Sequence, residues 1–343
     1  MNQISKNEDL FMKLNILFII SFSFVVLLNN VFSSSKYITS FNQNICEKSV
    51  VDSTDYLEID LFNIELLPKW LKECNRIETL YLNNKTNVNE NYDISILSEM
   101  NSLVNLNIFN FNKIYLRMNK NRFFPSLRLL RIGSCKLVNI PFWIKDLKNL
   151  NDLIIYNDSI KSIPGFLINL PKFNSLTLYN TQTEFLSKKI FIKEQLQNLL
   201  LSNNNKIDLK RLFRNIDNCK LEYFSIEQCG VTHLPKEIRY LSKVKFLILW
   251  RNFLEELPNQ MELLDSLRFI SLQVNKFKCF PEILTKIPNI DCIELDSNFI
   301  QEIPIDLIKK MKKIESISLR GNPIPLHERE RISKELPNIK FEF

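Results

Sequence analysis

The chain has 343 residues, of which 45% are hydrophobic, and a formal net charge of +7 at pH 7. Because its acidic and basic residues are interspersed, this charge indicates a solvated mixed surface, not an extended basic face. With only 4 Gly there is no glycine-rich phosphate loop, and with only 2 His there is little support for Ser–His or Cys–His catalysis. Cysteine and histidine spacing also matches no metal site. We therefore predict a non-enzymatic protein without cofactor, metal or small-molecule substrate.

Residues 1–35 differ in composition from the rest of the chain. Two lysines precede an apolar run from Leu14 to Leu28, and three serines follow the run. This order of charged, apolar and small residues is typical of a secretory signal peptide, and we predict a cleaved signal over residues 1–33. The alternative is an uncleaved membrane anchor over residues 14–32, since an apolar run of this size approaches the length that spans a bilayer.

Apolar residues recur at a fixed interval over residues 54–325, which predicts a solenoid. The polar segment 34–53 before them is too short for a repeat and is expected to cap the first coil, because an exposed solenoid end needs a polar cover. Most repeat starts are 23 residues apart, and the pattern is least regular between Ile77 and Leu127. The predicted starts are Thr54, Ile77, Leu103, Leu127, Leu150, Phe173, Leu196, Leu221, Val244, Leu267, Ile290 and Ile314.

The repeat is clearest from Val244 to Pro325. Apolar residues three and five positions after each start, such as Leu247 and Leu249, predict a short strand with these side chains turned inward. An Asn at position +8, first Asn252, is able to hydrogen-bond the backbone of its own coil and of the next one. An apolar-Pro pair at +13 and +14 predicts a helical or 3₁₀ return leg with Pro at its first position.

This pattern resembles the leucine-rich-repeat (LRR) family, in the subclass of about 23 residues whose convex side reads LPxxIxxL. The resemblance implies an α/β fold: a curved solenoid of about twelve coils with a parallel inner sheet and short helices or 3₁₀ turns outside. Residues 326–343 look like the C-terminal cap of several secreted bacterial members, with a helix over Leu326–Glu335 and a final strand through Phe341.

The cysteines are interpreted through the same repeat. Cys135 and Cys229 fall at +8, where the LRR family accepts Cys in place of Asn, and Cys74 falls at +20, where later repeats have Leu or Ile. We expect all three to be buried as small hydrophobic residues. Cys46 in the cap is a possible disulfide partner of Cys74, as caps of secreted LRR proteins often contain such a bond, and both alternatives stay open.

The concave face is the candidate functional surface. Residues at +2, +4 and +6 alternate with the inward ones, so they point outward from the inner sheet. Several are apolar or aromatic, and aromatic residues are enriched where proteins bind proteins. In LRR proteins the concave face is the usual ligand surface, and the resemblance supports that use here. The predicted protein-binding residues are Tyr156, Tyr179, Tyr223, Phe246, Ile248, Trp250, Phe269 and Glu294.

Three functional hypotheses follow. The leading one is a secreted LRR protein whose concave face binds a protein partner, such as a host or cell-surface component. The alternative is a membrane-tethered receptor or structural protein, held by an uncleaved segment 14–32. An enzyme or nucleic-acid binder is the third, and the acidic residues Glu227, Glu294 and Asp296 on the inner face argue against nucleic acid.

Overall fold

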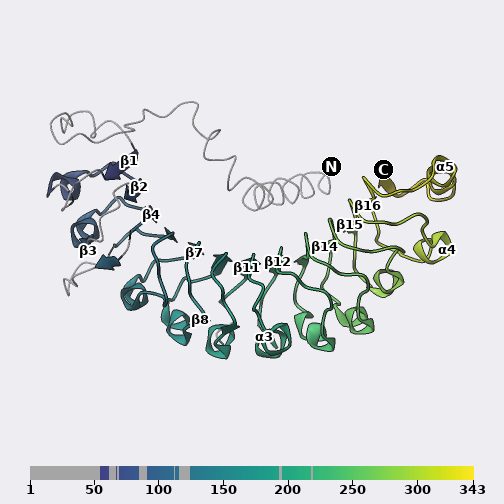
Figure 1. Cartoon of the computed structure of the whole chain (residues 1–343), viewed down its shortest axis with the longest axis horizontal. Coiled ribbons are helices and arrows are strands. Elements are labelled where there is room, and N and C mark those ends of the chain that lie inside the picture. Colours follow the sequence, from purple (N-terminus) through teal and green to yellow (C-terminus); the bar gives the residue numbers. More distant parts are fainter. Residues whose placement is uncertain are drawn as a thin grey trace.

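A computed structural model describes residues 55–61, 67, 69–84, 91–111, 113–115, 124–192, 195–217 and 219–343. These residues form a curved solenoid with strands along its concave side and short helices along its convex side (Figure 1). The predicted solenoid with a parallel inner sheet is therefore confirmed. The predicted signal peptide and N-terminal cap lie outside the described residues, as does Cys46, so the possible Cys46–Cys74 disulfide stays a prediction.

The inner sheet has 13 strands that follow each other in chain order, and every neighbouring pair is parallel. Twelve of the strands belong to the predicted coils, and the thirteenth is the final strand expected near Phe341. The strands are β1 (Tyr56–Leu61), β2 (Thr79–Asn84), β4 (Asn105–Phe109), β6 (Leu129–Gly133), β7 (Asp152–Tyr156), β9 (Ser175–Tyr179), β11 (Asn198–Ser202), β12 (Tyr223–Glu227), β13 (Phe246–Ile248), β14 (Phe269–Ser271), β15 (Cys292–Glu294), β16 (Ser316–Ser318) and β17 (Lys340–Glu342).

The convex side is formed mainly by 3₁₀ turns, as the return-leg pattern predicts. Proline stands one residue earlier than expected, because Pro258 is the cap that precedes η7 and not its first residue. The convex elements are η1 (Lys69–Glu73), η2 (Ser95–Glu99), η3 (Phe142–Asp146), η4 (Gly165–Asn169), η5 (Lys188–Phe191), α3 (Leu209–Ile216), η6 (Lys236–Leu241), η7 (Asn259–Leu263), η8 (Glu282–Lys286) and α4 (Ile305–Ile308).

Two small parallel sheets and a terminal helix complete the described fold. β3 (Asn91–Asp93) pairs with β5 (Lys113–Tyr115), and β8 (Ser162–Ile163) pairs with β10 (Phe185–Leu186). The helix α5 spans Leu326–Glu335, as the sequence predicts, and leads into β17. Because β17 pairs with β16, it covers the hydrogen-bonding edge of the last coil.

The core lies between the inner sheet and the convex turns. The inward strand positions are fully buried, for example Leu247, Leu249 and Ile270, each with 0% of its surface exposed. Cys74, Cys135 and Cys229 are buried in the same core, as expected from their repeat positions. Each coil contributes a few such side chains, so the apolar core is continuous along the solenoid and depends on stacking between neighbours.

A ladder of buried asparagines links successive coils. The Asn252 amide nitrogen donates to the carbonyls of Ile226 and Leu249 at 2.8 and 3.0 Å, and its oxygen accepts from the backbone N–H groups of Cys229 and Val231. Asn252 thus joins its own coil to the preceding coil, whereas the sequence suggested the next one. The same arrangement recurs at Asn275, Asn298 and Asn322.

Candidate functional site

A strip of aromatic side chains crosses the concave face. Tyr223, Phe246 and Phe269 occupy the same register position on β12, β13 and β14. Because each points outward from the sheet, the three rings lie side by side, with 6.4 Å between the centroids of each neighbouring pair. This spacing is within the range of favourable aromatic contacts, so the strip is a packed surface and not a set of isolated rings.

The strip belongs to a larger apolar group, which we call the inner-face cluster. It is separate from the main core, on the opposite side of the sheet. Arg251 places its guanidinium carbon 5.1 Å from the centroid of the Trp250 ring, a cation–π contact at the edge of the cluster. The members of the cluster are Leu200, Tyr223, Ile248 and Phe269, with Phe246, Trp250 and Cys292 packed against them.

The predicted site residues fall into three groups. Tyr223, Ile248 and Phe269 are buried within the inner-face cluster, each with 4% of its surface exposed, whereas Phe246 and Trp250 are half-buried. Glu294 is half-buried on the neighbouring strand β15. Two predicted residues lie apart from the cluster: Tyr156 is half-buried on β7, and Tyr179, on β9, is 39% exposed. Of the eight predicted residues, the structure therefore brings five together in the cluster, places Glu294 on the next strand and separates two.

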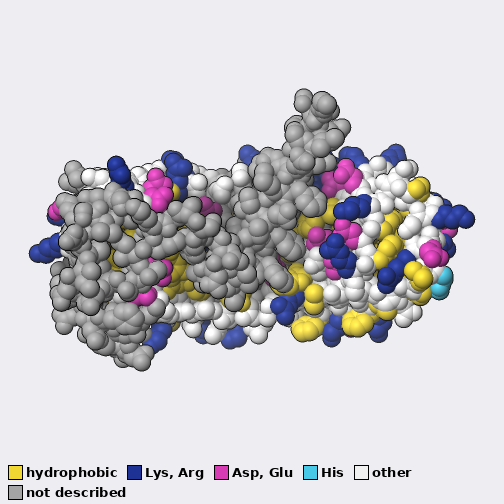
Figure 2. Space-filling view, turned by 90° about the horizontal axis from the view of Figure 1, so that it is seen from above, with side chains coloured by type: hydrophobic (Ala, Val, Ile, Leu, Met, Phe, Trp, Pro, Cys, Tyr) yellow, Lys and Arg dark blue, Asp and Glu magenta, His cyan; other side chains and the backbone are white. Residues whose placement is uncertain are grey.

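Carboxylates flank the inner-face cluster. Glu227 is buried and accepts a hydrogen bond of 2.6 Å from the Ser225 hydroxyl, and burial raises its pKa. Glu294 accepts from the Gln273 amide at 2.7 Å, and burial raises its pKa to about 7. The C-terminal part of the concave face accordingly places acidic and basic side chains next to hydrophobic ones (Figure 2). Such a mixture suits a protein surface with apolar and charged groups.

A second group of aromatic residues on this face was only partly predicted. Tyr81 and Phe109 lie with ring centroids 4.6 Å apart, and Phe109 and Tyr156 with centroids 5.1 Å apart. The latter two rings come from strands on either side of Gly133. The sequence singled out Tyr156 but not its partners. The signal in the sequence was Gly133, because a glycine inside a strand pattern often marks a site where another group approaches the backbone closely.

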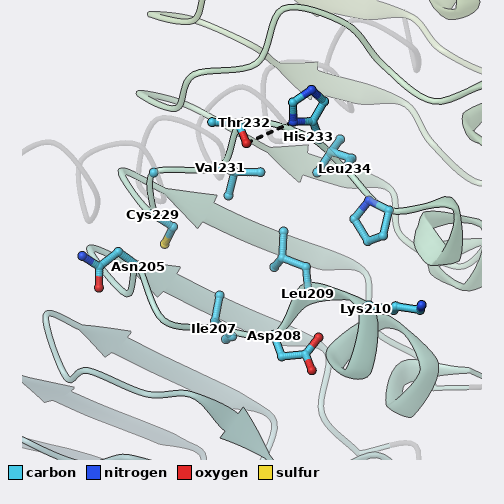
Figure 3. Close-up of a pocket in the computed structure, with 12 residues that line it drawn as sticks. Asn205, Ile207, Asp208, Leu209, Lys210, Cys229, Val231, Thr232, His233 and Leu234 are labelled. Carbon is cyan, nitrogen blue, oxygen red and sulfur yellow. Dashed lines mark hydrogen bonds between the residues drawn. The ribbon is translucent and has the colours of Figure 1, made fainter.

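A pocket of about 440 Å³ lies on the flank of the solenoid, beside the start of α3 (Figure 3). The apolar side chains of Ile207, Leu209 and Val231 line it, and the His233 ring and Thr232 hydroxyl, 3.1 Å apart, stand at its rim. The repeat pattern did not predict this pocket. It occurs where α3 replaces the usual short 3₁₀ turn.

Within the part of the chain that the structure describes, His, Cys, Asp and Glu side chains form no group of three or more that could hold a metal ion. No described helix has the length and apolar composition needed to cross a membrane.

The parallel inner sheet, the asparagine ladder and the short convex turns define a leucine-rich-repeat solenoid fold. No protein-family model matches the chain. Among solved structures, it is similar to an LRR protein of Leptospira interrogans, with 20% identity and a TM-score of 0.53, over 87% of this chain and 92% of that one. It is also similar to an internalin (inlF) of Listeria monocytogenes, with 17% identity and a TM-score of 0.55, over 88% of this chain and 83% of that one. At these identities the likeness defines the fold.

Proposed function

We propose that this protein is a non-enzymatic LRR scaffold that binds a protein partner through its concave face. The observation that carries the proposal is the inner-face cluster, in which outward-pointing apolar side chains on four successive strands contact each other and not the core. A solvated strand has no need of such residues, and contiguous apolar patches mark interaction sites. The likeness to an internalin fold supports the same interpretation.

Phe246 and Trp250 are the residues through which contact is expected. Both are half-buried against the cluster, so part of each ring remains available while the packed side supports it. A rigid aromatic side chain held in this way loses little conformational entropy on binding. Residues of this type, surrounded by packed neighbours, are the usual energetic centres of protein interfaces.

The partner is sought by site-specific photo-crosslinking. One variant carries a benzophenone amino acid in place of Phe246, and a matched variant carries it in place of Phe299, which is 57% exposed on a loop after β15. Both are incubated with solubilised cell-surface proteins and irradiated. We expect one protein to be crosslinked from position 246 and not from position 299. Crosslinking of the same protein from both positions, or from neither, would contradict the proposal.

Affinity for the crosslinked protein then measures the contribution of the site. Phe246→Ala and Trp250→Ala are each expected to weaken binding about 30-fold, the effect of losing about 2 kcal/mol at a central interface residue. Phe299→Ala is the control and should leave affinity unchanged. Circular dichroism spectra should be the same for all variants, because neither aromatic residue belongs to the main core.

We further propose that the protein is secreted or otherwise extracytoplasmic, with a membrane-anchored form as the alternative. The support is the order of charged, apolar and small residues at the N-terminus. N-terminal sequencing of the purified protein and membrane fractionation distinguish the two. A mature N-terminus near Ser34 in the soluble fraction supports secretion, and an intact Met1 in the membrane fraction supports the anchored form.

A further inference from the structure

Gly133 creates a gap in the concave face of the N-terminal half. It lies on β6 between Phe109 of β4 and Tyr156 of β7. Because the glycine has no side chain, the Tyr156 ring lies directly over its backbone: a Cβ added at Gly133 would be 2.2 Å from two ring carbons. The ring therefore leans across one strand toward Phe109, and its centroid is 5.1 Å from that of Phe109.

Arg131 lies in the row of side chains next to this gap. Its register neighbours are Asn107 on β4 and Ile154 on β7. The Asn107 side chain is almost fully buried; its nitrogen donates to the carbonyl of Leu80 at 3.2 Å, and its oxygen accepts from Arg131 Nη1 at 3.1 Å. Asn107 thereby binds one nitrogen of the guanidinium group, Nη1, and does not use the other N–H donors of Arg131.

The guanidinium group of Arg131 is only partly satisfied. Its Nε–H is buried and has no hydrogen-bond acceptor, and no ion pair between described residues includes Arg131. Burial lowers the pKa of Arg131, but the side chain stays charged because arginine is not deprotonated in proteins. Asp152 is near enough to influence the pKa of Arg131 but forms no ion pair with it, so the buried Nε–H still lacks an acceptor, which is costly and leaves capacity for an added anion.

Two tyrosine hydroxyl groups lie close to this cation. Tyr81 and Tyr156 are both near enough to Arg131 to influence its pKa. Burial raises the pKa of Tyr81 to about 12 and that of Tyr156 as well, so both hydroxyl groups keep their protons; the two hydroxyl groups also hydrogen-bond to each other, which uses one of these protons. The surrounding groups thus include a charged planar donor and a hydrogen-bonded pair of neutral hydroxyl groups on one surface.

We propose that Arg131, with the hydroxyl groups of Tyr81 and Tyr156, forms a binding site for a carboxylate side chain of the protein partner. A carboxylate is planar and accepts two parallel N–H bonds, which matches the free edge of a guanidinium group. Phosphate fits less well, because it carries more negative charge and Asp152 lies close to Arg131. This proposal depends on the proposed function in one respect: the carboxylate is that of an Asp or Glu side chain on the protein partner.

The site is testable without the partner by NMR on the full chain. The probe is sodium acetate, with sodium phosphate and sodium chloride at equal ionic strength as comparisons, and the signal is the Nε–H resonance of Arg131. The Arg131→Lys variant assigns that resonance by its disappearance. We expect acetate to shift the resonance in a saturable way, whereas chloride causes no saturable shift and phosphate saturates only at higher concentration.

Two conservative variants test the named neighbours. Tyr156→Phe keeps the ring over Gly133 and removes one donor, so the acetate midpoint should rise about two- to fivefold, the range of a single solvent-accessible polar contact. Asp152→Asn removes the nearby negative charge and should lower the midpoint by a similar factor. Absence of a saturable shift with acetate, stronger binding of phosphate, or unchanged midpoints in both variants would each overturn the proposal.

The two proposals fail separately. If acetate binds but Phe246→Ala and Trp250→Ala leave partner affinity unchanged, the carboxylate site stands and the inner-face cluster is not the interface. When a partner is known, its carboxylate is located with double-mutant cycles. Each acidic residue of the partner is changed by Glu→Gln or Asp→Asn, and its binding affinity is measured against the parent protein and against Tyr156→Phe. We expect one partner variant and Tyr156→Phe to be non-additive by at least threefold in affinity, whereas full additivity for every acidic residue would exclude a partner side chain as the ligand.

Discussion

At the scale of single residues, Asp158 is an exception within the asparagine ladder. It occupies the +8 position of its coil, and its Oδ1 accepts a hydrogen bond of 2.8 Å from the Leu137 backbone N–H. Its Oδ2 is buried without a hydrogen-bond partner. In the coil of Asn252 an amide nitrogen stands at this place and donates to two carbonyls, which an ionised carboxylate cannot do. Burial accordingly raises the pKa of Asp158 to about 6.

We predict that Asp158→Asn stabilises the protein at pH 8 and has little effect at pH 4. The folded-state pKa of about 6 lies above the value of about 3.9 in an unfolded chain, so the folded state binds this proton more tightly. Its contribution to stability is complete below pH 4 and is lost as pH rises through 6. The substitution should add about 1–3 kcal/mol at pH 8, the cost of one unsatisfied buried polar group.

Urea unfolding at pH 4, 6 and 8 measures this effect. Asp265→Asn, at an exposed position on the convex side, is the matched control and should leave the profile of the parent protein unchanged. An Asp158→Asn variant whose midpoint keeps the parent's dependence on pH between 4 and 8 would show that Asp158 does not titrate in this range.

At the scale of one coil, the ladder asparagine is the main polar link to the preceding coil. The Asn275 amide nitrogen donates to the carbonyls of Leu249 and Leu272, both at 3.0 Å, and its oxygen accepts from the Leu254 N–H at 3.0 Å. We predict that Asn275→Ala lowers the free energy of unfolding by about 2–3 kcal/mol, because it leaves buried backbone groups unpaired. Denaturant unfolding measures the loss, and Asn259→Ala, at an exposed turn position, should cost less than about 0.5 kcal/mol.

The repeated elements were predictable because each depends on a local pattern that recurs. Inward residues such as Leu247 have the same burial in successive coils, and the ladder asparagines from Asn252 to Asn322 have the same kind of partners, so many weak signals combine into one. The residue before the ladder position was not predictable. It adopts a positive φ in coil after coil, even where it is Arg251 or Val274, so the stacked coils impose this conformation against the preference of the side chain.

For the candidate site, only the face of the sheet on which it lies was predictable from the sequence. Alternation along the strands correctly assigned Phe246 and Trp250 to the outward side of the sheet. Alternation carries no information on packing between neighbours on that side, so it did not predict that Tyr223 is buried while Phe246 is half-buried. The contact between Tyr156 and Phe109 was missed for the same reason, since it crosses an intervening strand and requires the missing side chain of Gly133.

At the scale of the whole molecule, stability is expected to vary along the solenoid. Each coil contacts mainly its neighbours, so local stability follows the quality of nearby interfaces. Four consecutive coils, from Asn252 to Asn322, have ladder asparagines with complete hydrogen bonding. The corresponding position is Phe111 in an earlier coil, which has no side-chain polar group to link the backbones. The C-terminal half should therefore be the more stable part.

Hydrogen exchange tests this gradient. Backbone amides of β13–β16 should exchange more slowly than those of β2 and β4, because opening them breaks more inter-coil hydrogen bonds. Asn298→Ala should accelerate exchange in β14, β15 and β16, which flank the missing link, and leave β7 at the parent rate. Acceleration spread evenly over all strands would indicate that the solenoid opens as one cooperative unit. In that case a partner bound at the inner-face cluster would also protect the distant site at Arg131, which a nearest-neighbour solenoid would not do.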